Sequence, residues 1–131
     1  MNVGVLASGG GTNLQALIDA TARGELEPAR LVVVGVNVAG CGALERATRA
    51  ALPTFTVDHK RFAERTAFDR ALVSELHRHD VELVVLAGFM RILTPAFLDA
   101  FPGRVVNIHP ALLPGFPGTH AQRQADRKSV V

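Results

Sequence analysis

Asn107 and His109 are the two residues whose types and spacing most directly suggest chemistry. They alternate with Ile108 at the end of an apolar segment, 104–109, and alternate residues of a strand face the same side of a sheet. A carboxamide can donate to a developing oxyanion and an imidazole titrates near neutral pH, so the pair suits acyl transfer. A buried histidine bonded only to backbone groups would show the same spacing. Pro110 favours the catalytic interpretation, because it ends the strand at the sheet edge where ligands bind.

A second candidate site is the glycine-rich segment Ser8-Gly9-Gly10-Gly11-Thr12-Asn13, between an apolar run and a helical pattern. Consecutive glycines let the backbone approach an anion, and the amides at a helix start favour a phosphate. Thr12 or Asn13 is expected to cap that helix. The segment lacks the lysine of a P-loop, and Leu14 replaces the third glycine of a dinucleotide fingerprint. We therefore expect a phosphate monoester here; the alternative is a tight strand-to-helix turn without a ligand.

The third candidate segment is Gly88-Phe89-Met90-Arg91-Ile92-Leu93, which follows another apolar run. A turn followed by an irregular apolar stretch could form one wall of a cleft for a flat ring. An ordinary strand-to-helix connection is the simpler interpretation of these residues taken alone.

Short apolar runs alternate with amphipathic stretches along the chain and predict the elements that position these segments. The expected strands are Val3–Ala7, Leu31–Val36, Thr54–Val57, Glu82–Gly88 and Arg104–His109. Helices are expected from position 12 to Gly24, around Leu44, Ala47 and Ala51, from Phe62 to about His79, and at Pro95–Ala100. This order predicts an α/β fold, a doubly wound parallel sheet of five strands with helices on both faces. Ligands bind such sheets at the carboxyl ends of the strands where strand order reverses, which selects the three candidate segments.

Composition limits the classes of protein that remain. The 131 residues are 48% apolar and 20% charged, as in one ordinary soluble domain. A net charge of +2, two lysines and the absence of Trp and Tyr argue against a nucleic-acid surface. One cysteine, Cys41, fits a reducing compartment, and no apolar run is long enough for a membrane span, so we expect a cytoplasmic protein. His77 and His79 face different sides of the expected helix, and no metal is expected.

Taken together, the motifs resemble those of one known family. The segments 8–16, 86–93 and 106–114, with the continuation 115–122, are similar to phosphoribosylglycinamide formyltransferases. The resemblance runs in register from Met1 to about Ala125 and implies a Rossmann-like formyltransferase fold. It also implies direct transfer of a formyl group from 10-formyltetrahydrofolate, a co-substrate, to the amine of glycinamide ribonucleotide in purine (IMP) biosynthesis. Neither a metal nor a covalent intermediate is implied.

The resemblance implies roles for the residues that match the family's motifs. Asn107 and His109 match the catalytic pair, and Gly11, Thr12 and Asn13 match the binding site for the ribonucleotide phosphate. The positions that match the folate-binding residues are Arg65, Met90, Arg91, Ile92, Leu93 and Asn107.

The family pattern continues for several tens of residues beyond Ala125. In the family that part supplies the last strands, a C-terminal helix and an aspartate that orients the catalytic histidine. The final six residues, Asp126-Arg127-Lys128-Ser129-Val130-Val131, resemble the translation of a sequencing adapter. We expect residues 1–125 to be the N-terminal part of a formyltransferase domain and 126–131 to be a non-native tail. As written, the chain is expected to bind substrates poorly, to lack normal turnover and to be poorly soluble.

Three other functions are compatible with these motifs. Formyltetrahydrofolate hydrolase shares the fold and the Asn-Ile-His type of motif, but usually has a regulatory domain for which there is no room before Met1. Methionyl-tRNA formyltransferase usually has a different loop after Leu-Leu-Pro and an added tRNA-binding domain. A non-catalytic fragment that binds the phosphate of a nucleotide is the third alternative.

Overall fold

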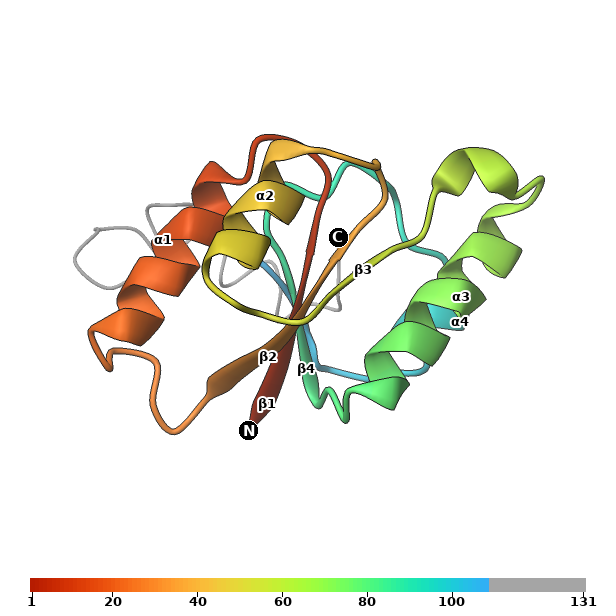
Figure 1. Cartoon of the computed structure of the whole chain (residues 1–131). Helices are drawn as coiled ribbons and strands as arrows, with labels where there is room; N and C mark the ends of the chain where they lie inside the picture. The colour runs from red at the N-terminus through yellow and green to blue at the C-terminus, as the bar shows by residue number, and fades with distance from the viewer. Residues whose placement is uncertain (109–131) are drawn as a thin grey trace.

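The computed structural model describes residues 1–108, which form a five-stranded parallel sheet in the order β3-β2-β1-β4-β5. The strands are β1 (Asn2–Ala7), β2 (Arg30–Val36), β3 (Thr54–Thr56), β4 (Leu83–Leu86) and β5 (Val105–Asn107). The helices are α1 (Thr12–Ala22), α2 (Gly42–Arg49), α3 (Arg65–Arg78) and α4 (Pro95–Leu98), with a 3₁₀ turn, η1 (His59–Arg61). The predicted doubly wound α/β fold is confirmed: α1 and α2 cover one face of the sheet, and α3 and α4 cover the other (Figure 1).

Two apolar cores lie on the two faces of the sheet because successive strand residues point to opposite sides. In β1, Val5 and Ala7 pack in the core under α1 and α2, whereas Leu6 packs in the core under α3. All three are fully buried, at 0% exposed surface. The run of apolar residues in β1 and β4 is therefore required by two covered faces.

Helix α3 shows how the sequence pattern produces the packing. Phe68, Leu72 and Leu76 recur every four residues, so they form one stripe on the helix, and each is at most 1% exposed. The predicted helix is confirmed in this part, but its start is not at Phe62. Asp58 accepts a hydrogen bond from the Lys60 amide at 2.9 Å, which caps η1 and leaves the following residues extended.

Phe62 nevertheless contacts the stripe of α3 from outside the helix. Its ring meets that of Phe68 edge-on, with 5.9 Å between the ring centroids.

Helix α2 is also shorter than predicted: it ends at Arg49, and Ala51 adopts a φ of +61° in the turn that follows. The Leu52 amide donates to the Ala47 carbonyl at 3.0 Å, which closes the helix before Pro53.

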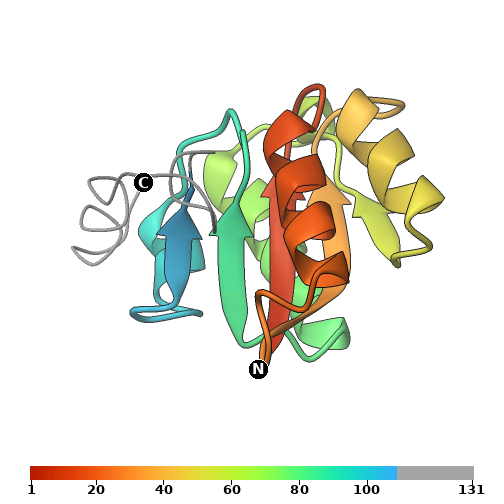
Figure 2. The same cartoon turned by 90° about the vertical axis from the view of Figure 1, so that its left-hand side faces the viewer.

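Strand order reverses between β1 and β4. The chain leaves β1 toward β2 and β3, then crosses back to place β4 on the other side of β1, with β5 beyond it. All the strands point the same way, so the loops after β1 and β4 leave the sheet side by side at its carboxyl edge (Figure 2). Ligands of open α/β sheets bind at such a reversal.

Three predictions cannot be placed because they fall outside the described residues. They are the end of the fifth strand at His109, the loop that follows it, and the proposed tail at 126–131. None of the helices in residues 1–108 is long and apolar enough to cross a membrane.

We expect Phe68→Ala to lower the free energy of unfolding by about 3–5 kcal/mol, because it removes a ring that is 1% exposed and leaves a cavity under α3. Urea denaturation measures the loss. Phe62→Ala is the control, since the Phe62 ring is only half-buried. A loss for Phe68→Ala no larger than that for Phe62→Ala would contradict this account of the core.

Candidate functional site

Ser8 joins the two loops that flank the strand reversal. It lies directly after β1 and is 6% exposed. Its Oγ accepts a hydrogen bond from the Met90 amide at 2.8 Å, and its own amide donates to the Gly88 carbonyl at 3.3 Å. The glycine-rich loop and the loop after β4 are therefore fixed to each other, although they lie about eighty positions apart in the sequence.

Gly11 sets the entry into α1. It is the N-cap residue, with φ +85° and ψ +22°. A Cβ at this position would lie 2.7 Å from the Cα of Ala43, so both the backbone conformation and the packing against α2 require glycine. The prediction that Thr12 or Asn13 caps the helix is wrong: these are the first two helical residues, and α1 has no side-chain cap. The turn out of β1 needs a left-handed residue immediately before the helix, which leaves no capping position for a side chain.

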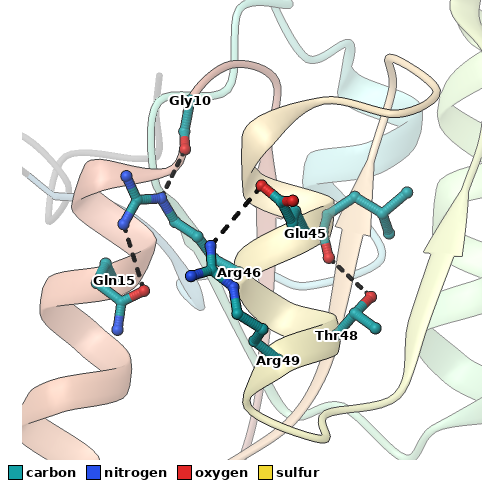
Figure 3. Close-up of polar contacts among 7 residues, drawn as sticks. Gly10, Gln15, Glu45, Arg46, Thr48 and Arg49 are labelled. Atoms are coloured by element: carbon teal, nitrogen blue, oxygen red, sulfur yellow. Dashed lines mark hydrogen bonds and ion pairs between the residues drawn. The ribbon is translucent and has the colours of Figure 1, made fainter.

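The carbonyl groups of the three consecutive glycines in this loop are each held by a hydrogen bond within the protein. Gly9 accepts from the Ala43 amide at 2.9 Å, and Gly11 accepts from the Gln15 amide at 2.8 Å. The Gly10 carbonyl accepts from Nε of Arg46 at 2.8 Å, as Figure 3 shows.

The amides at the start of α1 are left available by this arrangement. Among residues 1–108, no acceptor bonds the amides of Gly11, Thr12 and Asn13. Unpaired amides at a helix N-terminus, backed by the helix dipole, form a site for an anion. The structure thus places the three predicted phosphate-binding residues together on one turn.

The loop after β4 is anchored at its far end by Asp69, which lies on α3 and is 1% exposed. One carboxylate oxygen, Oδ2, accepts from the Thr94 amide at 2.6 Å and from the Thr94 hydroxyl at 2.7 Å. Leu93 is buried in the core beneath the loop. With Ser8 at one end and Asp69 at the other, the backbone of residues 90–93 is held in place.

The side chains of this anchored loop point in different directions. Met90 is 77% exposed and Ile92 is 66% exposed, so two apolar side chains of this loop are in contact with solvent. The guanidinium carbon of Arg91 lies 5.7 Å from the centroid of the Phe68 ring, a cation–π distance. An anchored backbone with exposed apolar side chains suits a flat, partly apolar ligand.

Asn107 ends β5 at the same edge. It is in register with Leu86 of β4, which is in register with Leu6 of β1. Neighbouring strands are about 4.8 Å apart, so Asn107 lies about 10 Å from β1, just beyond the chain that enters the Gly88–Leu93 loop. The Asn107 side chain is exposed. His109 is outside the described residues, so its pairing with Asn107 stays a prediction.

Comparison with known proteins identifies the family of this chain. The family model described as formyl transferase matches residues 1–130. The chain belongs to the formyl transferase family. The resemblance expected from the three motifs is therefore confirmed.

Individual relatives show which members of the formyl transferase family this chain is similar to. Phosphoribosylglycinamide formyltransferase of Escherichia coli (strain K12) is 47% identical over 125 residues, which are 95% of this chain and 58% of that protein. The trifunctional purine biosynthetic protein adenosine-3 of Chironomus tentans is 51% identical over 124 residues, or 94% of this chain and 9% of that protein.

A solved structure agrees with the described fold. The crystal structure of glycinamide ribonucleotide transformylase 1 from Symbiobacterium toebii superposes with a TM-score of 0.79 at 48% identity. The superposition covers 99% of this chain and 61% of that one. The formyl transferase chain thus spans about three fifths of the length of these bacterial relatives.

Arg65, the remaining predicted folate-binding residue, is the first residue of α3 and is exposed. It lies one turn before Phe68, the residue over which Arg91 is placed, and so on the side of α3 that approaches the loop after β4. Its side chain forms no hydrogen bond or ion pair with another residue in 1–108.

In residues 1–108, no three His, Cys, Asp or Glu residues are grouped as a metal site requires.

Two residues that position the site, Arg46 and Asp69, were not singled out from the sequence, and Ser8 was named only as part of the glycine-rich segment, without this role. Each acts through a hydrogen bond to a backbone group far away in the sequence. The spacing of residues along the chain does not reveal such a partner. Only Ser8 could have been suspected, because it is a polar residue immediately after a buried strand at the edge where the strand order reverses.

We expect Gly11→Ala to lower the free energy of unfolding by about 1–3 kcal/mol, because alanine is strained at this φ and its Cβ collides with Ala43. Gly9→Ala is the matched control, since a Cβ there meets nothing within 4 Å. Chemical denaturation of the two variants checks the difference. Equal stabilities would show that the described approach of α2 to the loop is incorrect.

Proposed function

We propose that this chain carries the substrate-binding part of a phosphoribosylglycinamide formyltransferase. The reaction moves the formyl group of 10-formyltetrahydrofolate to the amine of glycinamide ribonucleotide. The observation that carries the proposal is the bond between Ser8 and the Met90 amide. This bond supports the proposal because it joins the glycine-rich loop, with its free amides, to the loop with exposed apolar side chains. Transfer from a pterin-bearing donor to a phosphate-bearing substrate needs two such surfaces next to each other.

The glycine-rich loop binds the phosphate of the ribonucleotide in this proposal. The amides of Gly11, Thr12 and Asn13 supply the donors, and the Thr12 and Asn13 side chains are free of capping and can add contacts. A phosphate monoester fits better than a nucleoside triphosphate, because no lysine stands in the loop to neutralise further phosphates.

The loop after β4 binds the folate. Met90 and Ile92 offer apolar surface to the pterin, while the anchored backbone of residues 90–93 offers amides and carbonyls to its ring edge. Arg91 and Arg65 are two cations at this side of the site. Folates carry carboxylates, so exposed Arg65 is suited to an ion pair with the tail of the donor.

The chemistry proceeds by direct acyl transfer. The ribonucleotide amine attacks the formyl carbon, the carbonyl oxygen becomes an oxyanion, and the bond to N10 of the folate then breaks. Asn107 and protonated His109 donate hydrogen bonds to that oxyanion. The proton lost by the attacking amine reaches the departing folate nitrogen through His109, so charge and atoms balance.

We expect His109→Ala to lower formyl transfer by at least about 10²–10³-fold, because it removes an oxyanion donor together with the proton carrier. Binding of glycinamide ribonucleotide, followed by calorimetry, should change little, since its phosphate is held by the glycine-rich loop. The assay is best run in this chain extended to the length of its Escherichia coli relative, with the 131-residue chain in parallel. Turnover of the variant near that of the parent would refute the assigned role.

The same assay separates the proposed function from its alternatives. Release of formate without formylated ribonucleotide would identify a hydrolase, and formylation of methionyl-tRNA would identify the tRNA enzyme. Binding of glycinamide ribonucleotide without any transfer in either version would leave a non-catalytic binding module.

A further inference from the structure

The first turn of α2 is pressed against the glycine-rich loop. A Cβ at Gly42 would lie 2.7 Å from the Gly10 carbonyl oxygen, and a Cβ at Gly11 would lie as close to Ala43. The Ala43 amide bonds the Gly9 carbonyl. The loop that follows β1 therefore takes its shape from a helix that follows β2.

Arg46 extends this contact by one turn of α2. Its Nε donates to the Gly10 carbonyl at 2.8 Å and its Nη1 donates to Oε1 of Gln15 at 3.3 Å (Figure 3). Gln15 is fixed in turn, because its Nε2 donates to Asp19 one turn further along α1 at 3.0 Å. One guanidinium thus bridges α2, the loop and α1.

We propose that Arg46 is a positioning residue for the bound phosphate: it holds the Gly10 carbonyl toward α2, so that the amides that follow it face the anion. This inference rests on the proposed function. The peptide plane between Gly10 and Gly11 joins two residues without side chains and can therefore flip readily, and the bond from Nε of Arg46 to the Gly10 carbonyl opposes that flip. Rotation would turn a carbonyl oxygen toward the phosphate and an amide away from it.

The charge of Arg46 supports the same role. No carboxylate in residues 1–108 lies within ion-pair distance of it, whereas Arg49, one turn along the same helix, is paired with Glu45 at 3.7 Å (Figure 3). A half-buried guanidinium without a counter-ion, next to unpaired amides, raises the positive potential at the loop.

Three variants test the role, each made in this chain extended to the length of its Escherichia coli relative: Arg46→Gln, Arg46→Lys and the control Arg49→Gln. Heteronuclear NMR follows the amides of Gly10, Gly11 and Thr12 in the free proteins. Titration with glycinamide ribonucleotide gives the dissociation constant, and thermal unfolding reports general stability.

We expect the three amide resonances to move in free Arg46→Gln and its dissociation constant to rise about tenfold or more. Arg46→Lys keeps the charge but has no Nε donor and three freely rotating ones, so its resonances should also move while its affinity falls less. Arg49→Gln should match the parent in both measurements, because Glu45 is the one polar partner of its side chain within residues 1–108 and that side chain is 69% exposed.

Two results would overturn the inference. One is a free Arg46→Gln whose loop resonances and dissociation constant equal those of the parent. The other is weaker binding that follows lower thermal stability equally in Arg46→Gln and Arg49→Gln. Absence of ribonucleotide binding by the parent would instead refute the proposed function, and the free-state resonances would still decide whether Arg46 sets the loop.

Discussion

The site depends on one hydrogen bond, from the Met90 amide to the Ser8 hydroxyl, at the place where the strand order reverses. The loops that follow β1 and β4 lead to helices on different faces of the sheet, and the bond from the Ser8 amide to the Gly88 carbonyl at 3.3 Å joins only their first residues. The partly buried bond of 2.8 Å from the Met90 amide to Ser8 fixes the separation of the two loops further from the sheet. The glycine-rich loop with its free amides and the loop with the exposed Met90 and Ile92 side chains are therefore held next to each other.

The glycine-rich loop shows how a backbone becomes a binding site. The carbonyl groups of its three consecutive glycines are bonded to Ala43, Arg46 and Gln15, so the polar groups left unpaired on these glycines are amides. This asymmetry favours an anion over a cation at the loop, since amides attract and carbonyls repel negative charge. Glycine is needed on both sides of the contact between this loop and α2, for separate reasons. Gly11 of the loop has a positive φ, and Gly42 of α2 lies so close to the Gly10 carbonyl that there is no room for a side chain.

Much of the fold could be predicted because its signals are local. The apolar runs of β1 and β4 and the four-residue repeat of Phe68, Leu72 and Leu76 each reflect burial of a continuous surface. The errors arose where a nonlocal contact or a cap ended an element. Phe62 fits the repeat of α3 but is held outside it by the capped turn η1, and it reaches Phe68 across space instead.

The sequence by itself determined which strands and helices follow one another along the chain and which residue types end the strands. Through the motifs, it also determined the family. Periodicity and short motifs are properties of residues that are neighbours in the sequence, so they can be recognised without a structure. Only the tertiary structure decided that Gly11, and not Thr12 or Asn13, ends the turn into α1, and that Ser8, Arg46 and Asp69 hold the loops. Those contacts join residues 25 to 82 positions apart, and hydrogen bonds between distant segments form only once packing has brought the segments together.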